Sequence, residues 1–221
     1  MTQEKQDFLG TEPVGKLLVR LAVPAVAAQL VNMLYNIVDR IYIGHIEGVG
    51  ALALTGVGVC LPIIMVVSAF AALVSMGGAP RASIFMGQGK TASAEKTLGN
   101  CFTLQLCISA VLTAVLLMFN RPLLLSFGAS ANTIEYAVSY MSIYAIGTVF
   151  VQLTLGMNAF ITAQGFASIG MKTVLLGAVC NIILDPIFIF GFKMGVQGAA
   201  LATILSQGVS TVWVLLFLTG K

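Results

Sequence analysis

Two stretches of this sequence place carboxylates inside segments that are otherwise apolar enough to cross a membrane. The stretch LVNMLYNIVDRIYIGH carries Asp39, and the stretch CNIILDPIFIF carries Asp185. A carboxylate at the centre of a spanning helix costs about 2.5–3.5 kcal/mol on insertion scales, so such residues face a bundle interior or a wet cavity. Because carboxylate oxygens bind hard cations and also accept protons, both positions are candidates for a cation or proton site.

The first carboxylate belongs to a polar face. At 100° per residue, four polar side chains fall within about 80° of one helical face: Gln29, Asn32, Asn36 and Asp39. Lipid cannot satisfy these groups, so the face must point into a bundle or a cavity. A polar cluster that only holds helices together would explain the amides, but it explains the carboxylate poorly. Arg40 lies 100° further round and is expected at the rim.

The second carboxylate has an amide and a proline beside it. Asn181 and Asp185 are four residues apart, which places them on the same face of a helix. Pro186 removes one backbone donor, and we expect it to disturb the helix about one turn earlier, near Ile182. Freed carbonyls beside a carboxylate and an amide suit a hard cation or a proton. The alternative is a proline kink that serves packing alone.

Other polar residues are open to two interpretations. Hydroxyls in spanning helices usually bond to their own backbone, which is the simpler account of Thr203 and its neighbours Ser206 and Ser210. A second set recurs every four residues: Tyr136, Tyr140, Tyr144, Thr148 and Gln152. Tyr136 near a helix end fits an interfacial belt. The deeper tyrosines, Tyr140 and Tyr144, either line a cavity or pack in the core.

The elements that must position these residues are membrane helices. The chain has 221 residues, of which 58% are apolar and only 9% charged, with a mean hydropathy of +1.00; a soluble domain carries about 25% charged residues. Spanning β-strands alternate apolar and polar positions, whereas AVLTAVLLMF is a nearly continuous apolar run. We therefore expect an all-α integral membrane protein, embedded in a lipid bilayer, with six helices of about 20 residues or more: 16–43, 51–79, 95–119, 133–158, 168–191 and 195–219.

The basic residues predict an orientation. Residues 1–15 are expected to be a cytoplasmic segment ahead of the helical region 16–221. If so, the cytoplasmic side holds Lys5, Lys16, Arg20, Arg81, Lys90, Lys96, Lys172 and Lys221. The opposite side holds Arg121, Lys193 and, near the rim, Arg40. Because loops rich in Lys and Arg stay in the cytoplasm, we expect both termini to be cytoplasmic and the protein to reside in the plasma membrane.

Several function classes find no support in the sequence. The single histidine, His45, cannot complete a metal cluster or a nucleophile–base set with the four cysteines, which form no CxxC pair. The run MGQGKT lacks the first glycine of a phosphate-binding loop, because Ile84 occupies that position. The net charge of +3 is small and gives no indication of nucleic-acid binding. We expect no enzyme activity and no cofactor.

The motifs together resemble one family. RLAVPAVAAQLVNMLYNIVDRIYIGH, GGAPRASIFMGQGKTASAEKTLGN and NIILDPIFIFGFKMGVQGAALAT resemble the MATE (multidrug and toxin extrusion) transporters, in the bacterial branch of DinF-like and MepA-like proteins. The resemblance implies a fold of twelve helices in two six-helix lobes around a central cavity. It also implies exchange of Na+ or H+ for organic, often cationic, compounds. The six helices expected here correspond to the N-terminal lobe, so a second six-helix lobe is an expected partner, in the same chain or by pairing.

The resemblance also assigns roles to individual residues. It implies a coupling-cation site, for H+ or Na+, at Asp39, Asn181, Asp185 and Thr203, and a hinge at Pro24 in addition to the helix break expected at Pro186. Tyr140 or Tyr144 resembles a fourth-helix tyrosine of the same network. With Gln29, Asn32, Asn36 and Gln152, these tyrosines are the residues that we expect to line the substrate cavity. The sequence leaves the choice between Na+ and H+ open.

Two other functions remain open. A flippase of the wider superfamily would move lipid-linked sugars and would need Arg and Lys in its cavity for phosphate groups. The spanning helices here contain almost none, which favours cationic or neutral substrates. A membrane module that does not transport would use its polar faces only for helix contacts. Cation binding by the lobe distinguishes that module from a transporter.

Overall fold

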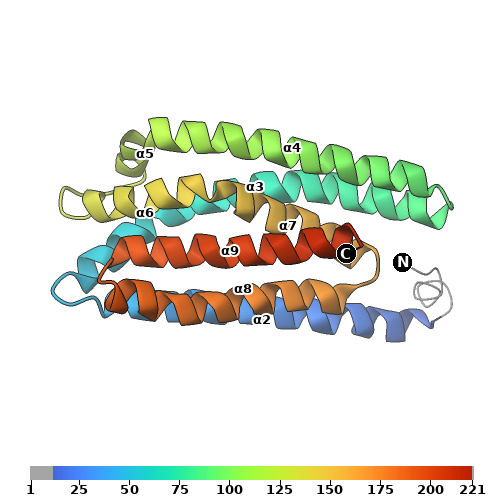
Figure 1. The fold of residues 1–221 in the computed structure, drawn as a ribbon, viewed down its shortest axis with the longest axis horizontal. Coiled ribbons are helices and arrows are strands. Elements are labelled where there is room, and N and C mark those ends of the chain that lie inside the picture. The colour runs from blue at the N-terminus through green and yellow to red at the C-terminus, as the bar shows by residue number, and fades with distance from the viewer. Residues whose placement is uncertain (1–11, 221) are drawn as a thin grey trace.

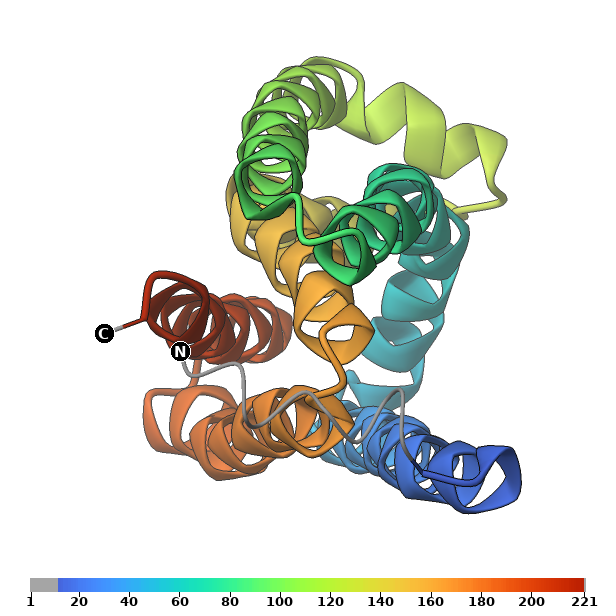
Figure 2. The ribbon, with the colours of Figure 1, turned by 90° about the vertical axis from the view of Figure 1, so that its right-hand side faces the viewer.

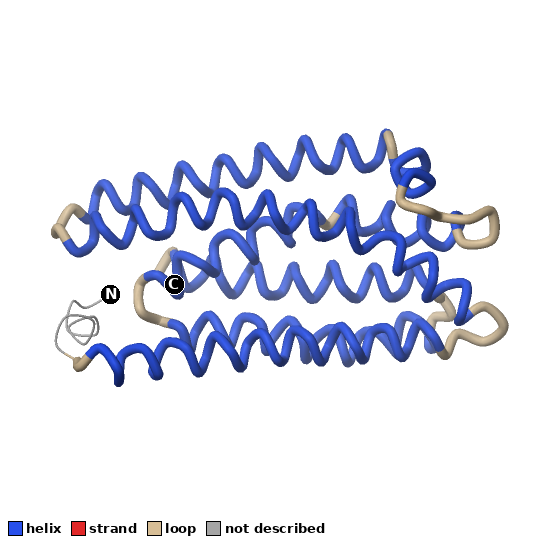
Figure 3. Tube along the Cα trace, turned by 180° about the vertical axis from the view of Figure 1, so that it is seen from behind, coloured by secondary structure: helices blue, strands red, loops and turns tan. Residues whose placement is uncertain are grey.

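In the computed structural model, which describes residues 12–220, the chain folds as a bundle of helices. Figure 1 shows the long helices lying side by side, and Figure 3 shows that loops are confined largely to the two ends of the bundle. The described part contains no strand. Its elements are α2 (Val14–Gly44), α3 (Gly50–Gly87), α4 (Thr91–Met118), α5 (Asn120–Ser126), α6 (Ile134–Ile146), α7 (Thr148–Ala163), α8 (Ala167–Pro186), η2 (Ile187–Gly191) and α9 (Val196–Leu218).

The number of membrane spans agrees with the all-α, six-helix expectation. Five helices are long and apolar enough to cross a membrane, and α6 with α7 makes a sixth if the bent pair is one span. The expectation of a single helix over 133–158 was wrong, because the chain bends by 57° between α6 and α7. Gly147 lies at the bend and packs so closely on α9 that a Cβ there would meet the side chain of Ile204. The second helix also continues to Gly87, beyond the expected end at 79.

Successive long helices run in opposite directions, which gives the bundle two distinct ends (Figure 1). One end holds the α3–α4 and α7–α8 turns, and we call it the basic end. Its described basic residues are Lys16, Arg20, Arg81, Lys90, Lys96 and Lys172. The far end holds the α2–α3 turn, α5 and η2. Lys5 and Lys221, which were expected on the basic side, lie outside the described residues.

Viewed end-on, α7 lies between two groups of helices (Figure 2). It packs against α3 and α4 on one side and against α8 and α9 on the other. Helix α2 packs mainly against α8 and buries only Asp39 and Ile43 of its 31 residues. The basic-end half of α2 is therefore the least anchored part of the described bundle.

Pro186 changes the helix after itself rather than before it. Helix α8 is continuous from Ala167 to Pro186, so the disturbance expected near Ile182 is not seen. The five residues of η2 that follow form a wider π-turn, in which the Phe192 N–H donates to the Ile187 carbonyl at 2.8 Å. This turn packs on Gly198, where a Cβ would lie 2.7 Å from the carbonyl carbon of Phe188. The proline is accommodated because the next turn widens and α9 approaches it through a glycine.

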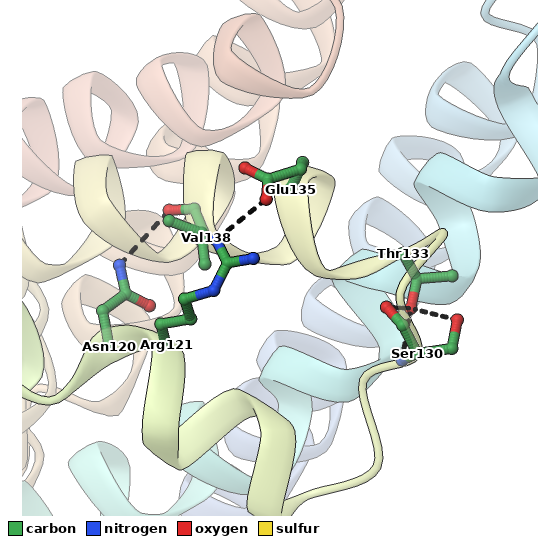
Figure 4. A network of polar contacts seen from close by, with 6 residues as sticks. All are labelled: Asn120, Arg121, Ser130, Thr133, Glu135 and Val138. Atoms are coloured by element: carbon green, nitrogen blue, oxygen red, sulfur yellow. Dashed lines mark hydrogen bonds and ion pairs between the residues drawn. The ribbon is translucent and has the colours of Figure 1, made fainter.

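Polar contacts connect α5 to α6 at the far end (Figure 4). The Asn120 amide donates to the Val138 carbonyl at 3.3 Å, and Arg121 forms an ion pair with Glu135 at 2.8 Å. Both partners of this ion pair are more than half exposed, so the pair contributes at most about 1 kcal/mol. Its consequence is that Arg121, one of the few cations at the far end, is locally neutralised.

Candidate functional site

Two carboxyl groups from different helices meet in the interior near the far end. Asp39 of α2 is 9% exposed and Asp185 of α8 is fully buried. The two carboxyl groups lie within electrostatic range of each other, so their negative charges would repel unless a proton or a cation lay between them. The contact between α2 and α8 therefore has this carboxyl pair at its buried point.

An amide and a hydroxyl complete the group, which we call the carboxylate cluster: Asp39, Asn181, Asp185 and Thr203. The Asn181 Nδ2 group donates to Asp185 Oδ1 at 3.2 Å and approaches Thr203 Oγ1 at 3.5 Å. Asn181 is 2% exposed. The i, i+4 spacing on α8 places the amide over the carboxylate, and α9 supplies the hydroxyl from the side. The structure thus brings together all four residues that the resemblance assigned to the coupling-cation site.

Three oxygens of the cluster lack a hydrogen-bond partner among the described residues. They are Asp39 Oδ1, Asp185 Oδ2 and Asn181 Oδ1. Buried polar atoms without a partner cost free energy, and native structures contain few of them. Oxygen ligands from carboxylates and amides are those that a hard cation takes, and a proton shared by the carboxyl pair would use the same atoms. The chemistry of the donor set therefore fits a cation or a proton.

The cluster does not fit a transition metal. The described residues contain no group of three or more His, Cys, Asp or Glu side chains that could hold such an ion. Only two of the four members carry a formal charge, and the others are a neutral amide and a hydroxyl. A site of this kind is suited to reversible binding of a weakly held cation.

Tyrosines surround the cluster. Tyr140 and Tyr144 of α6 are buried, and their rings stack with centroids 6.3 Å apart. The Tyr140 hydroxyl lies near the Thr203 side chain and within electrostatic range of Asp39. Tyr144 in turn interacts with Tyr35 of α2. Tyr140 therefore lies beside the cluster and Tyr144 stacks against Tyr140, and both are buried within the described residues.

Tyr35 is the residue that our sequence analysis missed. It lies one turn before Asp39, interacts electrostatically with both carboxylates and bonds to the Asn36 side chain. The i, i+4 spacing from Asp39 was the available signal. A tyrosine in an apolar segment is readily assigned to the membrane interface. The packing of α2 against α8 shows instead that Tyr35 lies beside the carboxylates.

The polar face of α2 continues from the buried cluster to the surface of the described bundle. Gln29 and Asn36 are exposed and Asn32 is half-buried. The Asn36 amide also donates to the Asn32 carbonyl at 2.6 Å, so part of its capacity is used within α2. The face therefore leads from open surface to Asp39, which is the buried end of the stripe.

Gln152 lies apart from the cluster. Its side chain is fully buried, and its amide donates to the Val67 carbonyl of α3 at 2.7 Å. One turn along α3, the fully buried Gln105 of α4 donates to the Ala71 carbonyl at 3.1 Å. We call Gln105 and Gln152 the glutamine pair. Because its amides tie α4 and α7 to the backbone of α3, Gln152 joins helices and does not line an open surface.

Pro24 lies inside α2, which remains one continuous helix from Val14 to Gly44. A proline removes one intrahelical hydrogen bond and so locally weakens a helix. Pro24 is half-buried, in the half of α2 that buries no residue. The helix is therefore held firmly near Asp39 and loosely around Pro24.

Comparison with known proteins gives concordant results. The family model described as MatE matches residues 24–187. A multidrug export protein MepA from Staphylococcus haemolyticus is 27% identical over 224 residues, which cover 100% of this chain and 48% of the relative. The MepA of Staphylococcus aureus strain N315 is also 27% identical, over 98% of this chain and 48% of the relative.

A solved structure shows the same fold. A structure described as MATE in the bent conformation superposes with a TM-score of 0.89 at 29% identity, and covers 99% of this chain and 48% of that one. The chain thus spans about half the length of the curated relatives and of the solved structure that it matches. These relatives are multidrug export proteins rather than enzymes.

Proposed function

Because the chain belongs to the MatE family and is a multi-pass membrane protein, we propose that it forms the N-terminal lobe of a secondary multidrug efflux antiporter. The observation that carries this proposal is the carboxylate cluster, in which three buried oxygens lack a partner among the described residues. The lobe would take up H+ or Na+ at this cluster in exchange for an organic, often cationic, compound. A second six-helix lobe would complete the cavity.

The first step of the mechanism is neutralisation. Two carboxylates in a low-dielectric interior repel each other, and a bound cation or shared proton removes this repulsion. Asp39 and Asp185 come from different helices, α2 and α8. Cation binding therefore favours a state in which the two helices are drawn together at this point. Release of the cation favours a state in which they separate.

The second step is movement of α2. This helix buries only Asp39 and Ile43, and Pro24 interrupts its hydrogen bonding in the unanchored half. A change at Asp39 would therefore be absorbed by bending at Pro24. The exposed stripe of Gln29 and Asn36, on the same face as Asp39, would move with the helix and alter the cavity wall. A similar solved structure is described as MATE in the bent conformation, which accords with a protein of this family that can bend.

The coupling energy is set by the membrane. One elementary charge that moves inward through 100 mV releases about 2.3 kcal/mol, which supports a concentration ratio of roughly 50 for an uncharged exported compound. If the exported compound is a monovalent cation, the two charge movements cancel and the concentration gradient of the coupling ion alone drives the exchange. The direction follows from the proposed orientation, with the basic end and both termini in the cytoplasm of a plasma-membrane protein. The carboxylate cluster then lies in the outer half of the bilayer, where an entering cation reaches it first.

Efflux tests this proposal in a transporter that contains both lobes. Asp39→Asn and Asp185→Asn, introduced separately, should each abolish dye efflux driven by a Na+ or H+ gradient. Full activity in both variants would show that the cluster is not the coupling site. The same assay, repeated with each gradient alone, decides between Na+ and H+.

Direct binding separates a transporter lobe from a membrane module that only packs. Calorimetry of the purified chain should show Na+ binding that weakens as the pH falls if protons and Na+ use the same oxygens. Absence of both Na+ binding and proton uptake would favour the packing module. Efflux of a cationic dye, without movement of lipid-linked sugars, would exclude the flippase alternative.

A further inference from the structure

A groove on the outer side of the α3–α4 hairpin is unrelated to the carboxylate cluster. It has a volume of about 720 Å³ and opens along the two helices near the basic end. We call it the hairpin groove. Its polar residues are Arg81, Ser93, Lys96, Thr97 and Asn100. The proposed transport cycle assigns it no task.

The polar residues gather at one level of the groove. Arg81 lies six residues before the end of α3 at Gly87, and Lys96 lies five residues after the start of α4 at Thr91. At 1.5 Å per residue both are about 8–9 Å from the turn, so they face the groove from opposite walls at similar depth. Two positive charges thus share one end of the groove with hydroxyl and amide groups.

Some basic residues of the described chain form ion pairs, but Arg81 and Lys96 do not. Lys16 and Arg20 pair with Glu12, and Arg121 pairs with Glu135. Within residues 12–220, neither Arg81 nor Lys96 forms an ion pair, and the Arg81 guanidinium lies 5.6 Å from the centroid of the Phe85 ring. An anion at this level would therefore find two cations that no carboxylate of residues 12–220 neutralises.

The deeper part of the groove is apolar. Its walls are Leu73 and Val74 of α3 and Leu104 and Ile108 of α4. Leu73 is eight residues from Arg81 and Ile108 is twelve residues from Lys96, which places these walls about 12–18 Å further into the membrane. Gly77 lines the groove between the two parts and leaves open space where a side chain would lie.

We propose that the hairpin groove binds one anionic phospholipid from the membrane leaflet at the basic end. The phosphate would lie between Arg81 and Lys96, with Ser93, Thr97 and Asn100 as further hydrogen-bonding groups, and an acyl chain would follow the apolar walls. Basic side chains near the membrane surface attract anionic lipids, and the change from polar to apolar lining along the groove matches such a molecule. A cationic drug would be repelled at the same place.

Native mass spectrometry of the purified chain tests the headgroup contacts. Micelles containing phosphatidylglycerol should leave one lipid bound, whereas phosphatidylcholine should leave much less. In the double variant Arg81→Gln/Lys96→Gln, the preference for phosphatidylglycerol should fall more than tenfold, because each basic residue near the membrane surface contributes about fivefold to the binding of an anionic lipid. The matched control is Lys16→Gln/Lys172→Gln, which removes the same charge from the same end but outside the groove and should retain the preference.

A second pair of variants tests the acyl-chain contacts and guards against misfolding. Gly77→Leu fills the groove, whereas Gly58→Leu adds the same side chain on α3 where a Cβ also meets nothing within 4 Å. Gly77→Leu should lower lipid occupancy several-fold and Gly58→Leu should not, with unchanged thermal unfolding in both. Equal lipid occupancy in the two glycine variants would overturn the proposal. So would an equal loss of the preference for phosphatidylglycerol in the two double charge variants. Displacement by inorganic phosphate alone would instead indicate an ion site without lipid.

Discussion

The bundle contains two groups of buried polar side chains that differ in how their hydrogen-bonding groups are used. In the glutamine pair, each amide donates to a backbone carbonyl of α3, and each residue is uncharged and fully buried. In the carboxylate cluster, two acidic groups lie within electrostatic range of each other, and three oxygens lack partners among the described residues. Both groups connect three helices, and both lie in segments of similar hydropathy.

The difference separates a polar contact that holds helices from one that binds something. The two Oε1 atoms of the glutamine pair also lack partners among the described residues, but they are neutral carbonyl oxygens on separate helices, α4 and α7. An uncharged amide is tolerated in a helix contact at modest cost. Two carboxyl groups in contact are tolerated only with a proton or cation between them. The two interacting acidic groups therefore identify the cluster, whereas burial and polarity alone do not.

The largest effect that would sharpen this comparison is expected at the carboxylates. Asp39→Asn and Asp185→Asn should each weaken cation binding by calorimetry at least tenfold, because each removes a charged ligand. Thermal unfolding should not be lowered, since each substitution also removes a repulsion. Gln152→Met, the matched change in the glutamine pair, should leave cation binding intact. Equal loss in all three variants would break the distinction between the two groups.

A smaller effect is expected at the hydroxyl of the cluster. Thr203→Val keeps the shape of the side chain but removes the group that interacts with Asn181 and Tyr140. Cation affinity should fall several-fold, measured by the same calorimetry. Thr154→Val is the control, because Thr154 bonds to Thr211 and the Gln207 carbonyl, away from the cluster. If Thr154→Val weakened cation binding as much, the effect would belong to α9 packing.

The glutamine pair should show the reverse pattern. Gln105→Met and Gln152→Met each remove one interhelical hydrogen bond, worth about 0.6 kcal/mol on average in a membrane bundle and up to about 1.7 kcal/mol. The free energy of unfolding, measured in mixed micelles with a denaturing detergent, should fall by that amount. Cation affinity should not change. A cation affinity that fell in these variants would mean that the pair belongs to the site.

The smallest effect is expected outside both groups. Arg121→Gln breaks the exposed ion pair with Glu135 at the far end (Figure 4). Such pairs contribute roughly 0–1 kcal/mol, and less at high salt. Unfolding and cation binding should both match the unsubstituted protein, and this variant supplies the baseline for the others. A large effect here would point to long-range electrostatics at the far end that neither group explains.

Much of the bundle followed from hydropathy, because each spanning segment must be apolar whatever its neighbours are. The i, i+4 spacing of Asn181 and Asp185 likewise placed both on one face without knowledge of the fold. The partnership of Asp39 with Asp185 came from the family resemblance, since 146 residues separate them along the chain. Contacts between helices depend on rotation and tilt, which a hydropathy pattern does not specify.

The errors have identifiable causes. A step of four residues advances by about 40° around a helix, so the stripe from Tyr136 to Gln152 turns by about 160° and its ends face different neighbours. The bend at Gly147 adds to this change of direction. Tyr140 thus lies beside the carboxylate cluster, whereas Gln152 reaches α3. Pro186 was predicted to act on the preceding turn, but a π-turn after it relieved the strain.

The bend between α6 and α7 also constrains how the protein is made. Helix α6 has 13 residues and α7 has 16, and each is shorter than the roughly 20 residues that a stable span requires. Neither helix alone is long enough to cross the bilayer with the polar backbone groups at both of its ends in contact with water. The two halves must therefore enter the bilayer as one unit. At the bend itself, Gly147 packs against α9, where an added Cβ would meet the side chain of Ile204.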